Sequence, residues 1–402
     1  MKTRRIAAFV CAALLSAAMI AVGCFSGVVR SAAAGVDGAD ACFYEAAGSL
    51  AADVTDAERT PLYDENGSRN GWQYTFTSGG ISGYALVTGY VINGMTVYET
   101  AELSCSAVSP FAECEGLPVY ITYEVYLDLR GGEYFDLATG EEVSADEVYE
   151  MSRVGFGYSG TGTFTDITQT TASYSRKETT DEYAIPYDLP AYASDVGTSN
   201  CANVAGSVAI GYYDRFCTEL IPDYQTYQQI GPIFRYKSAS SEISAVQSEL
   251  HELMGTDDGY VGTTFAGFEL GMSDYADERG YTYESYSVFG SDGAIDLTAL
   301  RASLVAGRPV ALFLYDYAIV SDISVSGGRD VITSRYSSVT HVAMCCGYRV
   351  DTYYDAQNNV TDERVYLRIV VGLNGVLNDA IGYLNINGDV TTINHAISVS
   401  IA

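Results

Sequence analysis

The stretch NCANVAGSVAIGYYD, residues 200–214, is the most informative part of this chain. Its apolar residues recur at helical spacing, which predicts a buried helix over residues 201–216. Cys201 stands in the first turn of that helix. A helix N-terminus offers unpaired backbone N–H groups and the positive end of the helix dipole, and both favour a thiolate. The stretch therefore indicates Cys201 as a candidate nucleophile.

A second stretch, THVAMCCGY at residues 340–348, places His341 at the start of an apolar strand. An imidazole near a thiol can form a thiolate–imidazolium pair and later donate a proton to a leaving amine. The backbone N–H of Cys201 could face a developing oxyanion. We therefore expect Cys201 and His341 to lie together. The competing interpretation is structural, because free cysteines and histidines with satisfied hydrogen bonds are common in protein cores.

Other residues of the same types compete less well. His251 lies between two glutamates on the polar face of a predicted helix, which favours a solvated role. His395 precedes an apolar C-terminal strand and is the main rival of His341. Cys217 is expected in the core.

The second half of the chain has an α+β layout, with helices first and a sheet afterwards. Beyond the helix at 201–216, the predicted helices are 241–253, 264–279 and 297–306. The predicted strands are 310–314, 341–348, 365–371 and a last run ending at Ser400.

The first half is expected to be a β-rich domain over residues 35–152. Its opening part, 35–68, is small and polar and suggests a loosely ordered lead-in with a short helix. Strands are predicted at 83–92, 95–100 and 119–126, with Asn93-Gly94 as a hairpin turn between the first two. Residues 141–151 predict a short closing helix. Residues 153–184 are rich in Gly, Ser and Thr and are expected to be a linker, with Arg176-Lys177 as a candidate processing site.

Residues 1–34 have the pattern of a signal peptide. Basic residues at the start precede an apolar run over 6–23, and Ser31-Ala-Ala-Ala34 offers small residues for cleavage. Lipidation at Cys24 is the alternative. Either way the pattern predicts a secreted or cell-surface protein. The formal net charge of −30 argues against binding to nucleic acid or to an anionic membrane.

Nine cysteines are present, and Cys11 and Cys24 lie in the expected leader. The remaining seven are an odd number, so at least one thiol is unpaired or pairs between chains. Cys105 and Cys114 flank a turn-like segment and are a candidate disulfide. The chain has no Cys-x-x-Cys pair, so we expect no structural zinc site and no cofactor.

Residues 200–214 resemble the nucleophile helix of bacterial papain-like cysteine peptidases, in particular the double-glycine-leader-peptidase-like and streptopain-like branches. That helix reads Asn-Cys-x-Pro-Thr-Ala and ends in Gly-Tyr-Tyr-Asp; here Asn203 and Val204 replace the proline and the threonine. Further matches are Gly262-Thr-Thr, Gly271-Met-Ser-Asp-Tyr-Ala, Arg279-Gly-Tyr281, Ala306-Gly-Arg-Pro-Val310 and Gly347-Tyr348. The resemblance covers residues 185–402, and the segment from Gly83 is similar to propeptide-like domains of the family.

The resemblance implies a papain-like catalytic domain over 185–402 with a propeptide-like domain packed on it. It implies a thiol protease that hydrolyses peptide bonds of a peptide or protein substrate through an acyl-enzyme. Two further departures from the family matter for the chemistry. Asp195 stands where the oxyanion-hole glutamine is usual, with Asn200 or Ser199 as substitutes. The strand over residues 365–373 has no Asn or Asp at the usual position of the residue that orients the histidine. Asn374 follows this strand immediately and is the candidate, and Asn378 and Asp379 come next.

These departures leave two alternatives to the peptidase. One is an amidase or transglutaminase-like acyl transferase, which uses the same nucleophile and base. The other is a degenerate papain-like scaffold that acts as a surface binding protein.

Overall fold

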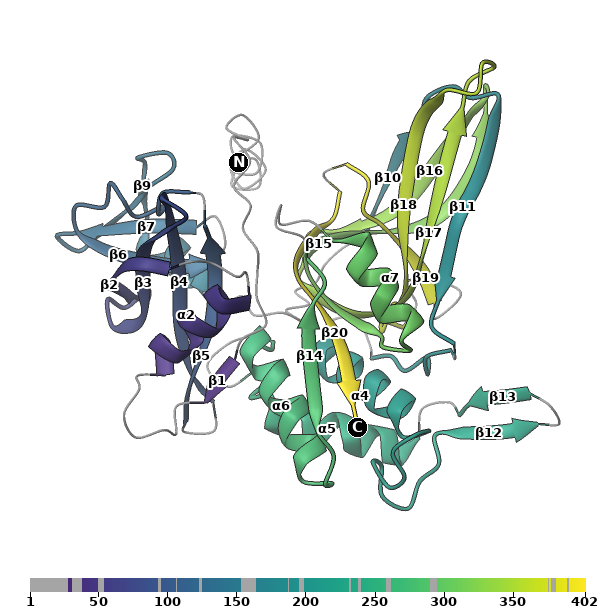
Figure 1. The fold of residues 1–402 in the computed structure, drawn as a ribbon, viewed down its shortest axis with the longest axis horizontal. Helices are drawn as coiled ribbons and strands as arrows, with labels where there is room; N and C mark the ends of the chain where they lie inside the picture. Colours follow the sequence, from purple (N-terminus) through teal and green to yellow (C-terminus); the bar gives the residue numbers. More distant parts are fainter. Residues whose placement is uncertain are drawn as a thin grey trace.

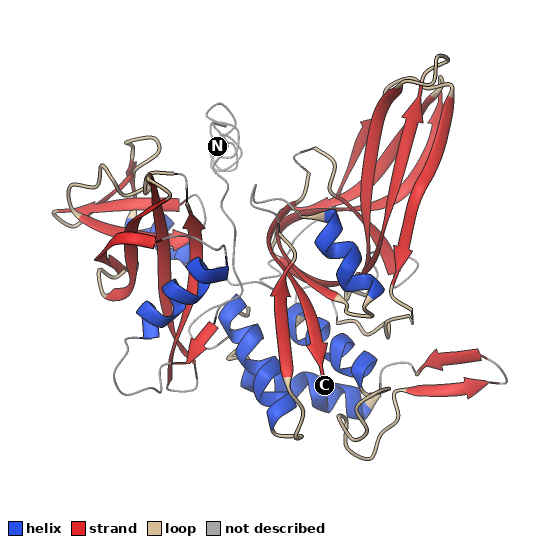
Figure 2. Cartoon of the chain, in the orientation of Figure 1, coloured by secondary structure: helices blue, strands red, loops and turns tan. Residues whose placement is uncertain are grey.

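Two nine-stranded sheets, one in each half of the chain, organise the structure (Figures 1 and 2). The structure is a computed structural model. It describes residues 28–30, 38–49 and 54–402, apart from 93–94, 106, 123–124, 153–163, 187, 195–198, 231–232, 238–239, 258–261, 290–294, 375, 377–380 and 389. Strands and helices are both abundant in it, which confirms the predicted α+β class at this coarse level.

The first sheet has the strand order β1-β5-β4-β3-β2-β6-β7-β8-β9. Helix α2 lies against it, with Phe43 stacked on Tyr74 in a small apolar core. The elements are β1 Val28–Arg30, α2 Gly38–Ser49, β2 Val54–Tyr63, β3 Arg69–Ser78, β4 Ile81–Ile92, β5 Met95–Ser104, β6 Leu117–Thr122, β7 Val125–Arg130, β8 Glu133–Asp136, β9 Glu142–Val143 and α3 Ala145–Ser152.

The sequence predictions for this half are partly confirmed. Strands β4 and β5 pair as an antiparallel hairpin with Ile92 opposite Met95, as predicted. The single strand predicted at 119–126 is instead a hairpin of β6 and β7. The lead-in predicted at 35–68 contains α2 and the whole of β2. Most side chains of β2 are exposed, so its sequence lacks the apolar alternation by which strands are recognised.

Most of the expected leader lies outside the described residues, including Cys11 and Cys24. Its described part, Val28–Arg30, forms β1 and pairs with β5. Among the described residues, no helix combines the length and apolar character that crossing a membrane requires. Cys105 and Cys114 are free thiols, so the candidate disulfide between them is not formed.

The second sheet is built around β15, which pairs with β16, β17, β19 and β20. Because β17 also pairs with β18, and β18 with β19, these strands close on themselves (Figure 1). The elements are β10 Thr165–Thr170, β11 Arg176–Ala184, α4 Cys201–Tyr213, β12 Tyr227–Ile230, β13 Ile233–Tyr236, α5 Ser241–Leu253, α6 Phe265–Asp277, β14 Tyr283–Ser287, α7 Leu297–Val305, β15 Val310–Ser326, β16 Arg329–Ser337, β17 His341–Tyr354, β18 Val360–Val370, β19 Ile381–Asn385 and β20 Thr392–Ile401.

The linker expected over 153–184 is, from residue 165 on, part of this sheet. Strands β10 and β11 pair with β16 and β17 and stand at opposite ends of the main strand order. Arg176 and Lys177 therefore lie in a paired strand, and Lys177 is tied to Asp330 and Asp351. Paired backbone cannot enter a protease site without local unfolding, so this arrangement speaks against processing at the basic pair.

Helix α4 is buried along its whole length, between α5, α6 and the second sheet. The Gly-Tyr-Tyr-Asp end of the helix has a structural role. A Cβ on Gly211 would come within 2.9 Å of the Tyr192 ring, while Tyr212 donates to the Gly307 carbonyl and Tyr213 to the Val399 carbonyl. These contacts hold α4 in one position, and so fix where Cys201 stands.

The two halves meet at α6, which lies between the sheets in Figure 1. Val97 of β5 packs on Ala266 and Leu270 of α6. The carboxylate of Glu99, buried on β5, accepts a hydrogen bond of 2.9 Å from the Ala266 backbone N–H. A side chain of the first half thus satisfies one of the free amides at the start of a helix in the second.

Candidate functional site

Cys201 is the first residue of α4 and is 3% exposed. Its sulfur accepts a hydrogen bond of 3.1 Å from the backbone N–H of Val342. Because Val342 directly follows His341, the sulfur lies at the peptide bond that joins these two residues. The structure therefore brings the expected thiol and the expected histidine together.

His341 is the first residue of β17 and is 2% exposed. Its Nε2 lies 2.8 Å from the carbonyl oxygen of Val371. A carbonyl can only accept, so Nε2 carries the ring proton and donates it. In the neutral ring Nδ1 then has a free lone pair, and within the described part of the chain it makes no hydrogen bond. The Val371 carbonyl thus selects the tautomer in which Nδ1 is the base.

The Val371 carbonyl takes the place that we expected for the side chain of Asn374. Gly372 has φ +72° and turns the chain directly after Val371, and Asn374, beyond this turn, is exposed. The Asn374 backbone N–H donates to the Ser194 carbonyl, and the Ser194 N–H donates to the Gly372 carbonyl. The segment before Cys201 is thereby joined to the turn after Val371.

Burial dominates the electrostatics of the pair. It raises the pKa of Cys201 to about 12, against the lowering effect of the hydrogen bond from Val342. It lowers the pKa of His341 to about 4, against the opposing effect of the Val371 carbonyl. At neutral pH both groups are uncharged in this state. The expected thiolate–imidazolium pair is therefore not the resting form, because both charges would be buried without water.

The expected oxyanion residues have different outcomes. Asp195 lies outside the described residues. Asn200 directly precedes α4 and is half-buried, and its Oδ1 accepts 3.1 Å from Nδ2 of Asn203. Among the described residues, no hydrogen bond of the Asn200 Nδ2 is found. The Asn200 side-chain amide is therefore available as a donor, one residue before Cys201.

Asn203 explains one departure from the family pattern. It is fully buried, and its Oδ1 accepts a hydrogen bond of 3.0 Å from the hydroxyl of Thr256, which in turn bonds Thr263 at 2.7 Å. The side chain thus ties the first turn of α4 to the connection between α5 and α6. A proline here would lack these polar atoms.

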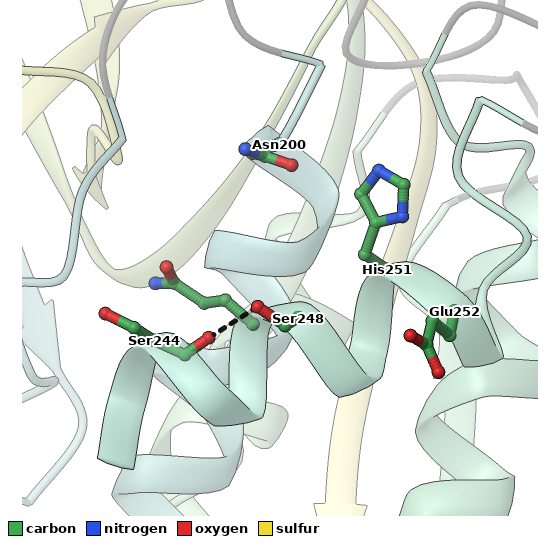
Figure 3. Close-up of a pocket in the computed structure, with 6 residues that line it drawn as sticks. Asn200, Ser244, Ser248, His251 and Glu252 are labelled. Atoms are coloured by element: carbon green, nitrogen blue, oxygen red, sulfur yellow. Dashed lines mark hydrogen bonds between the residues drawn. The ribbon is translucent and has the colours of Figure 1, made fainter. Parts of the chain in front are cut away.

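An open polar pocket lies beside Asn200 (Figure 3). Figure 3 shows Asn200 at the start of α4 and His251 on α5 on facing sides of it. Gln247, which also lines the pocket, donates to the Ser207 hydroxyl of α4 at 3.1 Å. The complete lining is Asn200, Ser244, Gln247, Ser248, His251 and Glu252. The pocket supplies polar side chains directly beside α4.

The rival residues lie elsewhere. His395 is buried on β20 with its ring stacked on Phe265 at 4.0 Å, and burial lowers its pKa to about 3. Cys217 is buried, and its sulfur contacts the Ile401 carbonyl at 3.6 Å, as expected for a core cysteine. His251 is half-buried, 3.7 Å from Asp257.

Sequence reasoning missed two parts of the site. The first is the Val371 carbonyl, since a backbone acceptor leaves no trace in residue type. The second is Tyr317 on β15, whose ring stacks on that of His341 with centroids 5.0 Å apart. Tyr317 lies beyond the strand predicted at 310–314, so nothing in the sequence places it at the histidine.

Comparisons of the chain with known protein families, with curated proteins and with solved structures found no match. Among the described residues, no group of three or more His, Cys, Asp and Glu side chains is placed to hold a metal ion.

Proposed function

We propose that this chain is a papain-like cysteine peptidase that cleaves peptide bonds with Cys201 as nucleophile and His341 as base. The observation that carries the proposal is the hydrogen bond between His341 Nε2 and the Val371 carbonyl, 2.8 Å long. This hydrogen bond leaves Nδ1 of His341 as the base. The backbone N–H of the next residue, Val342, contacts the Cys201 sulfur. A thiol at a helix start and an oriented imidazole are the two groups that thiol acyl transfer needs.

In the proposed reaction Nδ1 of His341 takes the proton of the Cys201 thiol as the sulfur attacks the substrate carbonyl carbon. The new C–S bond forms while the carbonyl oxygen becomes an oxyanion. This tetrahedral intermediate then collapses as the C–N bond breaks and Nδ1 gives the proton to the leaving amine. A water molecule then loses a proton to Nδ1 and attacks the thioester. The C–S bond breaks, the carboxylic acid leaves, and the thiolate recovers the proton. The Val371 carbonyl stabilises the imidazolium at Nε2 in both stages.

The oxyanion of each stage needs donors close to Cys201. The backbone N–H of Cys201 at the start of α4 and the Nδ2 of Asn200 are the groups suited to this role. Turnover also needs a state in which Cys201 is reached by substrate, since it is 3% exposed here. Opening would bring water to both groups and so move their pKa values toward those of an ion pair.

Hydrolysis of dye-labelled casein by the full chain tests the proposal. We expect Cys201→Ala to lower the rate by about a thousandfold or more, because no other group replaces the nucleophile. Cys217→Ala is the matched control, a buried cysteine that should keep the rate. Likewise His341→Ala should abolish turnover, and His395→Ala should not. Equal rates for Cys201→Ala and the wild type would contradict the proposal.

The burial of the pair also favours a second candidate, a binding protein on a scaffold that does not turn over substrate. Its uncharged thiol would then react like any core cysteine. Iodoacetamide under native conditions separates the two. A peptidase should be alkylated at Cys201 well before Cys217 and Cys345, whereas a binding protein should show no such preference.

A further inference from the structure

Tyr317 contacts His341 on the face of its ring. The two rings are stacked, with centroids 5.0 Å apart and planes inclined by 29°. Tyr317 lies on β15, three residues beyond Leu314, which is paired with His341 in the sheet. It is 1% exposed, so the contact is made without water.

Phe164 also contacts the Tyr317 ring. Its ring meets Tyr317 edge-on, with centroids 6.1 Å apart and planes at 72°. The residue directly precedes β10, which is fixed to β16 by pairing. The Tyr317 ring thus contacts both Phe164 and His341.

The hydrogen bond to Val371 and the stacking on Tyr317 control different motions of the imidazole. The hydrogen bond decides which edge of the ring faces Val371, and hence the tautomer. A single bond to a carbonyl leaves the tilt of the ring free. An aromatic face packed on the imidazole restricts that tilt.

We propose that Tyr317 is a positioning residue for His341, whose aromatic face fixes the tilt of the imidazole while the Val371 carbonyl fixes its tautomer. The inference rests on the proposed function for its kinetic consequence, but its structural part does not. The Tyr317 hydroxyl lies near enough to Cys201 that a charge on the thiol raises its pKa, after the larger effect of burial. The ring therefore stands beside both members of the pair.

Two substitutions separate the aromatic face from the hydroxyl. Tyr317→Phe keeps the face, and we expect its kcat to stay within about threefold of the wild type, because one buried hydroxyl contact is lost. Tyr317→Leu removes the face. We expect its kcat to fall by about 10- to 100-fold with little change in KM. Substitution of residues that orient a functional side chain typically has an effect of this size.

Nitrogen NMR of the histidine-labelled chain provides a readout that needs no activity. The chain has three histidines, so His341→Phe identifies the His341 signals by difference. We expect one tautomer with the proton on Nε2 in all three forms, because the Val371 carbonyl is unchanged. The His341 signals should be sharp in the wild type and in Tyr317→Phe, and broadened in Tyr317→Leu, where the tilt of the ring is no longer restricted. A wild type without hydrolysis but with this NMR pattern would defeat the proposed function and leave the positioning role supported.

Three results would overturn the inference. They are sharp, unchanged His341 signals in Tyr317→Leu, an unchanged kcat in an active Tyr317→Leu, and equal losses in Tyr317→Phe and Tyr317→Leu. If Tyr317→Leu does not fold, Phe164→Leu carries the test, because it frees one side of the Tyr317 ring. We expect it to broaden the His341 signals, and sharp wild-type signals would then count against the role.

Discussion

Strand β17 has buried polar side chains at both of its ends, and the two ends treat them differently. At the end of the strand, Asp351 accepts hydrogen bonds from Arg349, Thr179 and Lys177. Asp330 of β16 accepts from Lys177, Tyr174 and Tyr353. At the start of the strand, Cys201 and His341 each have one hydrogen bond to the backbone among the described residues.

The pKa values follow this difference. Burial would raise the pKa of Asp330 and Asp351, but the donors around them outweigh it and hold both below the usual value. At Cys201 and His341 burial prevails, and both groups stay uncharged. A buried polar group with all its partners stabilises a fold, whereas one with few partners keeps capacity for another molecule. This contrast separates the structural end of β17 from the candidate site.

The largest expected effect is at the structural end. Lys177→Met leaves two buried carboxylates without their shared cation, and we expect a loss of about 3–5 kcal/mol in the free energy of unfolding. Arg176→Met is the matched control on the neighbouring residue, whose partner Glu178 is exposed, and should cost less than about 1 kcal/mol. Urea denaturation measures both. Similar losses in the two variants would remove the distinction between the ends.

Glu99 is an intermediate case, a buried carboxylate with two donors, Tyr90 and Ala266, and no cation within the described residues. Burial raises its pKa to about 7 from 4.5, helped by the nearby Glu269. The folded state binds the proton more tightly, so its contribution is full below pH 4.5 and is lost as the pH rises to about 7. Glu99→Gln should therefore gain on the order of 3 kcal/mol above pH 7 and nothing below pH 4.5.

Thermal unfolding across this pH range measures the gain, with the exposed Glu58→Gln as control. A gain that does not depend on pH would show that the buried charge of Glu99 is not its source.

At the candidate site the sign is reversed. The pKa of His341 falls from 6.5 to about 4, so the folded state resists protonation. Its contribution is full above pH 6.5 and is lost as the pH falls toward 4. Relative to His341→Phe, the wild type should lose about 2 kcal/mol of unfolding free energy between pH 7 and pH 4.5. His395→Phe should give a difference of the same sign, and a flat difference for His341 would mean that its ring is solvated.

The smallest expected effect is Cys201→Ser. A hydroxyl can accept the Val342 N–H as the sulfur does, so we expect less than about 1 kcal/mol of change in stability. Cys201→Ala leaves that amide unpaired and should cost about 1–3 kcal/mol. Urea denaturation of the two variants compares them. A larger loss in the serine variant than in the alanine variant would contradict the assigned hydrogen bond.

The sequence was informative where apolar residues recur at helical spacing. Helix α5 was predicted with both of its ends, and α4, α6 and α7 within three residues, because their apolar stripes face one core. Cys201 and His341 were predicted as a pair from the elements they begin. These are local signals, and local patterning suffices for them.

The distal strands escaped prediction because their residues are polar. The outer half of β15 and the whole of β16 carry Ser, Thr, Asp and Arg, yet they pair through backbone groups that any residue supplies. Gly327-Gly328, both with positive φ, formed a usable hairpin signal between them. The contact of Tyr317 with His341 depends on long-range pairing, and a single sequence carries no record of it.

The bridge between Ser194 and the turn at Gly372 has a consequence for assembly. It joins the segment that precedes Cys201 to the turn that follows Val371. The Val371 carbonyl is the hydrogen-bond acceptor for His341. Displacing either segment would misalign thiol and imidazole in one movement, so the pair should form or fail as a unit during folding.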